Sequence, residues 1–116
     1  MQTTTLTTSD GRVVCEHCLL ARRPWHRMRG LLGRSSLAPG EGMLFQPAGS
    51  IHMFFMRFAI DAIFCDRDLV VIDVERDLAP WRTAGRRGAK IVVEVAAGAA
   101  AGVRPGDRLV LGTIDA

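Results

Sequence analysis

Short apolar runs separated by turn residues dominate the chain and predict a β-rich fold. Residues 50–57 and 60–65 are apolar at both alternating sets of positions, which is typical of central strands covered on both faces. Residues 69–75 form the clearest strand, and the turn residues 66–68 join it to the run before it as a hairpin. Further short strands are predicted over residues 12–15, 43–45, 91–95 and within 103–111.

One segment has helical rather than strand periodicity. Pro24 suits the first turn of a helix, Gly33 suits its end, and apolar residues recur between them at helical spacing, at Trp25, Met28, Leu31 and Leu32. Residues 96–102 predict one or two further helical turns. The sequence therefore predicts a mainly β (α+β) fold. We expect a small barrel-like or sandwich sheet of about seven or eight strands, with one amphipathic helix and a short second helix.

Length and composition favour one domain. The chain has 116 residues, of which 48% are hydrophobic and 23% charged, as is usual for a globular protein. A core of this size needs no disulfide or metal to be stable. Residues 1–10 are polar and rich in Thr, so we expect a flexible or edge-strand N-terminus, followed by a single compact domain over residues 11–116.

Targeting signals are missing from the sequence as given. No run approaches the roughly 20 apolar residues that span a bilayer. The first residues lack both the basic region and the apolar region of a signal peptide. The chain has three cysteines, and an odd number favours reduced thiols. We therefore expect a cytoplasmic protein without a membrane partner.

The charge balance is mildly basic. There are 15 basic and 12 acidic residues, for a net charge of +3, and Lys90 is the single lysine among the basic residues. Arginine binds carboxylate and phosphate in a bidentate way that lysine cannot. A genome rich in G and C would produce the same bias, together with the many Ala and Gly. The excess of positive charge is too small to require a polyanionic partner.

Several motifs occur in an order that resembles a known family. They are Arg29-Gly30-Leu31-Leu32, Gly40-Glu41-Gly42-Met43-Leu44, the segment from His52 to Phe64, Val93-Glu94-Val95-Ala96-Ala97-Gly98 and Val103-Arg104-Pro105-Gly106-Asp107. Together they resemble the uncharacterised prokaryotic family catalogued as domain of unknown function 192. The resemblance covers nearly the whole chain and implies a small β-rich fold with short helices. It implies no established activity and supplies no catalytic residue.

The chain also departs from the commonest form of that family. The common form has a Trp-Met-Lys-Asn-Thr stretch and then a longer run to its Asp. Here Phe55-Met56-Arg57 is followed directly by Phe58-Ala59-Ile60-Asp61, and the Asn and Thr are missing.

Cys15-Glu16-His17-Cys18 is a candidate metal or redox motif. A Cys-x-x-Cys pair supplies two thiolates at the spacing found in zinc sites, or a redox couple. A structural zinc ion needs four ligands, and no second paired motif occurs in the chain. The alternative is that both cysteines belong to a strand or its end and pack as ordinary apolar residues.

His52 and Asp61 are candidates for a general base. His52 lies in a predicted apolar strand, and Asp61 follows at its turn or on a partner strand. Ser50 shares a strand face with His52, but this spacing does not direct its hydroxyl as a nucleophile. In the alternative interpretation His52 is a partly buried structural residue and Asp61 caps a turn.

Arginines on one face of the predicted helix form a candidate anion-binding surface. Phosphate contacts favour arginine, and Trp25 or Trp81 could stack on a base. No recognised nucleic-acid motif occurs, and an ordinary solvated basic face fits the same pattern. The arginines concerned are Arg22, Arg23, Arg27, Arg29 and Arg34, with Arg57, Arg82, Arg86 and Arg87 from other segments.

These patterns favour a non-enzymatic binding or accessory domain whose partner is an anionic small molecule or a protein. Its candidate ligand-binding residues are His52, Arg57, Asp61, Arg29, Arg34, Trp81 and Arg82. No catalytic residue and no cofactor is assigned. An alternative is a small enzyme or a metal or redox protein that uses Cys15, Cys18 and His52, with zinc at the cysteine pair. A third interpretation is nucleic-acid binding through the arginine-rich face.

Overall fold

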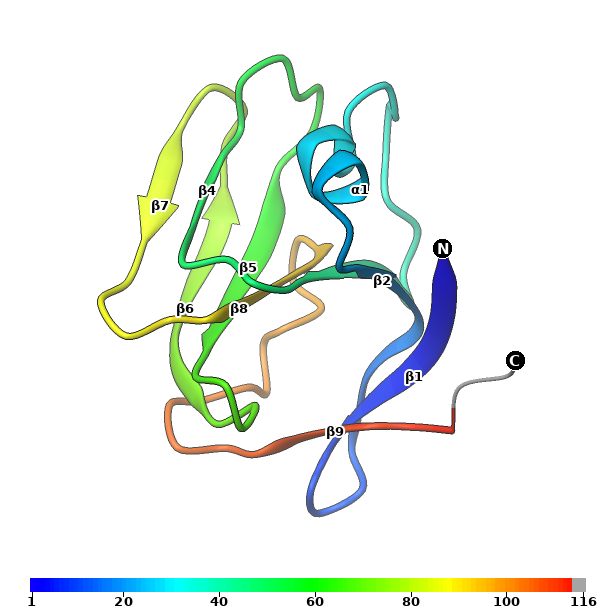
Figure 1. The fold of residues 1–116 in the computed structure, drawn as a ribbon, viewed down its shortest axis with the longest axis vertical. Helices are drawn as coiled ribbons and strands as arrows, with labels where there is room; N and C mark the ends of the chain where they lie inside the picture. The colour runs from blue at the N-terminus through cyan, green and yellow to red at the C-terminus, as the bar shows by residue number, and fades with distance from the viewer. Residues whose placement is uncertain (114–116) are drawn as a thin grey trace.

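Nine strands and one helix are formed by residues 1–113, the part of the chain that the computed structural model describes. In chain order they are β1 (Gln2–Thr8), β2 (Val13–Ala21), α1 (Pro24–Arg29), β3 (Glu41–Phe45), β4 (Ser50–His52), β5 (Ile60–Cys65), β6 (Val71–Leu78), β7 (Thr83–Gly85), β8 (Ile91–Ala96) and β9 (Leu109–Leu111) (Figure 1).

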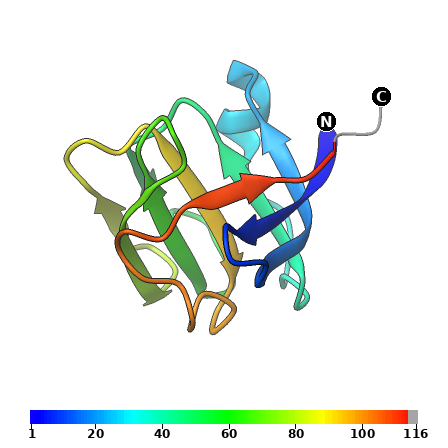
Figure 2. The same ribbon diagram turned by 90° about the horizontal axis from the view of Figure 1, so that it is seen from below.

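Seven of these strands form one curled sheet in the order β6-β5-β8-β3-β2-β1-β9. Its neighbours are antiparallel except for the parallel pair β2 and β3. The curl brings the two edges of the sheet together. Val70, just before β6, forms a β-bridge with Arg108, just before β9. Figure 2 shows this half-barrel, with β9 crossing in front of the other strands. β4 and β7 form a separate two-stranded sheet. The mainly β, barrel-like prediction is confirmed.

The curled sheet is apolar on both faces. On β8, Ile91, Val93 and Val95 belong to a cluster that includes Leu6 of β1 and lies inside the curl. Val92 belongs to a second cluster on the opposite face. That cluster is covered by the segment after α1, by β4 and by the loop between β4 and β5, which contribute Leu31, Ile51, Met53 and Met56. Double coverage explains why all six residues of β5 are buried.

The N-terminal residues are part of this sheet. β1 pairs with β2 on one side and with β9 on the other, so it has a neighbour along both edges. The turn that follows β1 is closed by Arg12, whose backbone N–H donates to Thr8 Oγ1 at 3.1 Å. Thr8 also donates its hydroxyl to the carboxylate of Asp10.

The helix is shorter than its apolar pattern predicts. α1 ends at Arg29 and buries none of its residues, so that Trp25 and Met28 are exposed. Gly30 is the cause, because its backbone (φ 50°, ψ −130°) leaves the helical path and turns Leu31 into the core. A side chain is strained in that conformation, and a Cβ would lie 3.3 Å from the ring of Phe45. No helix within residues 1–113 has the length and apolar character needed to span a bilayer.

Two other predicted elements are replaced by loops. Only Ser50–His52 of the predicted strand 50–57 is a strand, and it lies in the small sheet rather than at the centre of the large one. Met53 and Met56 point into the core while Phe54 and Phe55 are exposed, so the segment cannot alternate as a strand does. The second short helix predicted over residues 96–102 is absent, and turns take its place.

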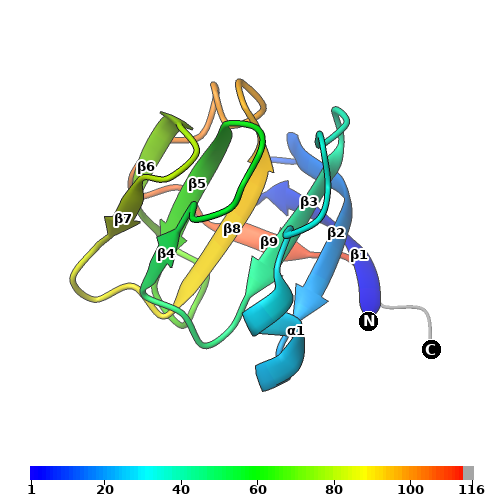
Figure 3. The same ribbon diagram turned by 90° about the horizontal axis from the view of Figure 1, so that it is seen from above.

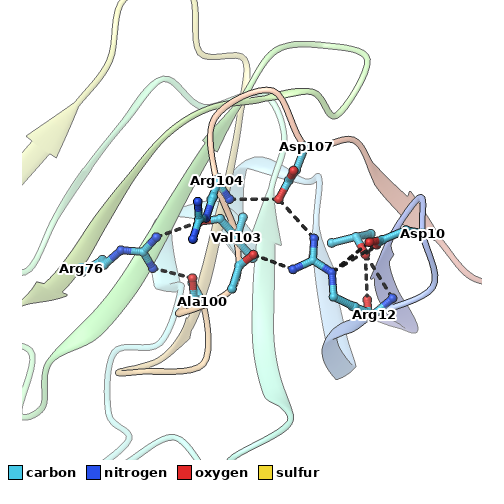
Figure 4. A network of polar contacts seen from close by, with 9 residues as sticks. Asp10, Arg12, Arg76, Ala100, Val103, Arg104 and Asp107 are labelled. Carbon is cyan, nitrogen blue, oxygen red and sulfur yellow. Dashed lines mark hydrogen bonds and ion pairs between the residues drawn. The ribbon is translucent and has the colours of Figure 1, made fainter.

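Those turns are held by Arg76 of β6 and by Arg12, which lies in the turn between β1 and β2. Arg76 donates one guanidinium N–H to the carbonyl of Val103 at 2.7 Å and another to that of Ala100. Arg12 donates to the carbonyl of Gly102 at 2.8 Å and forms an ion pair with Asp107 at 3.5 Å. Figure 4 shows the two guanidinium groups on either side of the segment. These side-chain hydrogen bonds therefore fasten the turns to β6 and to the turn between β1 and β2.

Candidate functional site

A cavity of about 290 Å³ lies between the end of α1 and the segment that leads into β4. β3 and β8, which lie side by side in Figure 3, contribute Phe45 and Glu94 to its lining. The apolar part of the lining includes Leu31, Leu32, Phe45, Ile51 and Met56. The polar lining is supplied by Arg27, Arg29, Ser50, His52 and Glu94. An apolar cavity with a few convergent polar groups is typical of small-ligand sites.

Glu94 is the buried acid of this cavity. It lies in the middle of β8, paired with Met43 of β3 on one side and with Ala62 of β5 on the other. Its exposed fraction is 6%, and its carboxyl group makes no hydrogen bond or ion pair with any side chain or backbone group of residues 1–113. Burial raises the pKa of Glu94 to about 8. The group is therefore mostly protonated at neutral pH and can both donate and accept a hydrogen bond.

Arg27 carries the second unpartnered group of the cavity. One of its terminal N–H groups donates to the carbonyl of Pro47 at 3.1 Å, which fixes the guanidinium against the segment before β4. Its Nε is buried and has no hydrogen-bond partner in the described part of the chain. Arg27 and Glu94 line the same cavity, but the guanidinium group and the carboxyl group do not form an ion pair with each other. Within residues 1–113, Nε of Arg27 is the one fully buried side-chain nitrogen or oxygen atom without a partner, which costs free energy, whereas the carboxyl group of Glu94 reaches the accessible surface of the cavity.

An exposed aromatic cluster, which we call the aromatic rim, begins at the mouth of the cavity. His52 stacks on Phe54 with ring centroids 4.9 Å apart, and Trp81 contacts both Phe54 and Phe55. Phe55 and Trp81 have positive φ angles of 65° and 71°, which are uncommon for aromatic residues and cost about 1–3 kcal/mol each.

Two backbone hydrogen bonds hold the aromatic rim together. Met53 donates its N–H to the carbonyl of Arg82, and Trp81 donates its N–H to the carbonyl of Met53, both at 2.7 Å. These bonds fasten the loop after β4 to the turn before β7. Exposed aromatic rings are thus held in place beside the cavity by the backbone.

The sequence-predicted ligand residues do not gather in one place. His52 and Arg29 line the cavity. Trp81 belongs to the aromatic rim. Arg57 and Arg82 are exposed on the two loops that carry this rim.

Arg34 and Asp61 lie outside the cavity lining. Arg34 forms an ion pair with Glu41 at 3.4 Å. Asp61 is 1% exposed and accepts backbone N–H groups from Asp77, Gly98 and Ala100 at 2.9, 3.0 and 3.1 Å. Its carboxylate thus fastens β5 to the turn after β8 and to the bulged end of β6.

Cys15 and Cys18 both point into the cluster inside the curl and are fully buried. Residues three apart on a regular strand face opposite sides, but β1 pairs Leu6 with Cys15 and Thr4 with Cys18, which leaves a bulge in β2. The neighbouring thiol of Cys18 lowers the pKa of Cys15. The neighbouring thiol of Cys15, together with burial, raises the pKa of Cys18.

His52 lies on the other side of the sheet from the cysteine pair, so the structure does not bring Cys15, Cys18 and His52 together. No group of three or more His, Cys, Asp or Glu side chains within residues 1–113 could hold a metal ion. Zinc at the cysteine pair stays a prediction that elemental analysis of the purified protein can test.

Glu94 and Arg27 are the site residues that sequence reasoning missed or left undistinguished. Glu94 is the single charged residue in the apolar run of β8, and a charge inside a doubly covered strand is a usable signal of a buried polar site. Arg27 carries no such signal, because it is one of several arginines in and around α1.

Comparisons with known proteins agree with the resemblance seen in the sequence. The profile of domain of unknown function 192, described as Uncharacterized ACR, matches residues 5–111. A UPF0127 protein of Thermococcus sibiricus is 46% identical over 98 residues, which cover 78% of this chain and 61% of that protein. The chain thus spans less than two thirds of the length of this relative.

Two solved structures share the fold. One is a Sinorhizobium meliloti protein provisionally described as a transcription regulator. It has a TM-score of 0.81 and 28% identity, over 95% of this chain and 92% of that one. The other is a protein of unknown function from Novosphingobium aromaticivorans. It has a TM-score of 0.79 and 29% identity, over 93% of this chain and 83% of that one.

Proposed function

We propose, from the premise that the chain belongs to the family known as domain of unknown function 192, that it is a ligand-binding domain. Its ligand would be a small polar organic molecule held in the cavity between α1 and β4. The observation that carries this proposal is the carboxyl group of Glu94, which is buried, unpartnered and at the border of a cavity.

The energetics of Glu94 support a binding role. A polar group that is buried without a hydrogen bond costs about 1–3 kcal/mol, judged from substitutions in proteins. A methionine or leucine at this position would fill similar space between Met43 and Ala62 without that cost. A ligand that hydrogen-bonds to the carboxyl group would recover the lost free energy, so the arrangement favours binding over packing.

The rest of the lining favours binding over catalysis. Ser50 is the one hydroxyl group of the lining, and it makes no hydrogen bond to His52 within the described residues. A serine nucleophile needs a base within hydrogen-bond reach. Arg29 and His52 line the cavity. Both belong to the anion- or partner-binding surface that the sequence predicts. We propose the cytoplasm as the place of action, since the three cysteines are free thiols.

Two-dimensional NMR of the ¹⁵N-labelled chain tests the proposal. The probes are 4-methylpentanamide, 4-methylpentan-1-ol, 4-methylpentanoate, 3-methylbutylamine and leucine, which share a branched apolar skeleton and differ in polar group. We expect at least one probe to shift the amide signals of residues 29–32 and 48–52. The variant Glu94→Met should lose these shifts, whereas Glu16→Met, at an exposed acid on β2, should keep them.

Two outcomes would overturn the proposal. In one, no probe shifts the cavity signals of the wild-type chain. In the other, a probe is chemically converted during the titration, which new probe signals would reveal and which would make the domain an enzyme.

A further inference from the structure

We infer that the cavity takes a small zwitterion of the α-amino acid type. Its ammonium group would bind Glu94, its carboxylate would face Arg27, and its apolar side chain would lie against the walls formed by Leu31, Phe45 and Met56. This inference rests on the proposed function and names the chemical class of the ligand.

Two groups of opposite character line one cavity. Glu94 offers a carboxyl group that no side chain or backbone group of residues 1–113 contacts by hydrogen bond, and Arg27 offers a guanidinium group held in place by its hydrogen bond to Pro47. The two do not form an ion pair with each other. A ligand that satisfies both must carry a donor or cation at one end and an acceptor or anion at the other.

A ligand of single charge satisfies only half of this arrangement. A simple anion would meet Arg27 and Arg29 but would leave Glu94 without an ionic partner. A simple cation would pair with Glu94 but would lie near the guanidinium groups of Arg27 and Arg29 without an anionic group to pair with them. Because like charges disfavour binding and buried polar groups need partners, a zwitterion fits better than either.

Size and wall chemistry restrict the zwitterion further. The volume of about 290 Å³ is at the lower end of the range of about 300–1,000 Å³ for small-molecule sites. A single amino acid with an apolar side chain is of this scale, whereas a drug-sized molecule would protrude. The apolar walls favour a branched or thioether side chain over a charged one.

Proton exchange accompanies binding in this scheme. Burial keeps Glu94 largely protonated in the empty cavity at neutral pH, since its pKa is about 8. When the ammonium group binds, the carboxyl group transfers its proton to solvent and becomes the carboxylate of a buried ion pair. Affinity for the zwitterion should therefore rise as the pH rises from 6 to 8. The other ionisable groups of the lining are Arg27, Arg29 and His52, so His52→Asn separates any contribution of the histidine.

Isothermal titration calorimetry with three matched probes tests the inference. Leucine carries both charged groups, 4-methylpentanoate lacks the ammonium group, and 3-methylbutylamine lacks the carboxylate. We expect leucine to bind the wild-type chain at least tenfold more tightly than either analogue. Glu94→Gln, which keeps the shape of the side chain, should abolish the preference for leucine over 4-methylpentanoate. Arg27→Lys, which keeps the charge but removes the planar guanidinium group, should weaken leucine binding and leave that of the amine unchanged.

The outcomes separate the inference from the proposed function. If 4-methylpentanoate or 3-methylbutylamine binds as tightly as leucine, the cavity is a site for a simple ion and the zwitterion inference is wrong, while the proposed function stands. The same conclusion follows if only the amide or the alcohol of the NMR panel binds. If none of the five probes reaches the cavity, both proposals fail. Circular dichroism and urea unfolding of each variant confirm that it is folded before titration.

Discussion

Asp61 of β5 and Glu94 of β8 belong to adjacent residue pairs of the antiparallel ladder between these two strands. Asp61 pairs with Val95, and Glu94 pairs with Ala62. Both are almost fully buried. Successive residues of a strand point to opposite faces, so one carboxyl group enters the turn region after β8 and the other enters the cavity. Asp61 accepts three backbone N–H groups, and Glu94 accepts none within residues 1–113.

The difference separates a structural acid from a binding acid. The carboxyl group of Asp61 accepts hydrogen bonds from three backbone N–H groups and so joins three segments of the chain. Glu94 joins nothing and weakens the fold by its burial. Burial of an acid alone therefore does not mark a functional site. The marker is burial without partners, next to a cavity.

The largest expected effect is the loss of the structural acid. Asp61→Ala leaves the N–H groups of Asp77, Gly98 and Ala100 without their acceptor. Each buried N–H group left without an acceptor costs about 1–3 kcal/mol, and because the three share one acceptor and their costs do not simply add, we expect a total loss of about 3–5 kcal/mol in the free energy of unfolding. Urea unfolding measures it. Asp68→Ala, at an exposed turn residue, is the matched control, and an equal effect of both substitutions would contradict the assignment.

The second effect is a pH dependence that belongs to Glu94. Its pKa of about 8 in the folded chain lies above the ordinary value of 4.5, so between these values the unfolded chain releases a proton that the folded chain keeps. Stability should fall as the pH rises from 5 to 8, by about 3–4 kcal/mol, and level off above pH 8. The fall should be absent in Glu94→Gln and present in His52→Asn. Parallel profiles of the wild-type chain and Glu94→Gln would contradict the account.

A smaller effect, of opposite sign to that at Asp61, is expected when Glu94 becomes apolar. Glu94→Met replaces an unpartnered carboxyl group by a flexible apolar side chain and should raise the free energy of unfolding by about 1–3 kcal/mol at pH 7. Thermal unfolding with and without leucine checks both halves of the claim. The variant should be more stable than the wild-type chain, and leucine should not stabilise it further. A loss of stability would mean that Glu94 has a structural partner.

The smallest effect concerns the arginine that supports the turn region. Arg12 donates to the carbonyl of Gly102 and forms ion pairs with Asp10 and Asp107, but its side chain is half-exposed. Arg12→Ala should cost about 0.5–1.5 kcal/mol and should leave ligand binding unchanged. Urea unfolding and calorimetry with leucine measure the two quantities. A loss of leucine affinity in this variant would show that the two regions are coupled.

The sequence predicted the strands better than the loops, for a physical reason. β5 and β8 are largely apolar runs that are buried on both faces, so their patterns alone identify them. Residues 50–57 have the same composition, but Phe55 adopts a positive φ and the chain leaves the strand after His52. A local pattern cannot show such a break, because tertiary contacts hold the loop in place.

The candidate site was less predictable than the fold. The sequence marked His52 and Arg29, which line the cavity, but it grouped them with Asp61, whose partners come from distant segments. Whether a buried acid has partners depends on three-dimensional packing, which spacing along the chain does not reveal. Glu94 could have been flagged as the lone charge in β8, although its cavity depends on how α1 ends at Gly30.

A direct titration of the side-chain carboxyl group of Glu94 by ¹³C NMR tests the central claim, that this acid is buried without a partner. Spectra of the free chain recorded from pH 4 to pH 10 give the midpoint, and the variant Glu94→Gln assigns the signal. The account predicts a midpoint near 8 in the free chain and a clearly lower one when leucine is bound. A midpoint near the ordinary value of 4.5 in the free chain would show that the carboxyl group is hydrated or paired, and would contradict the claim.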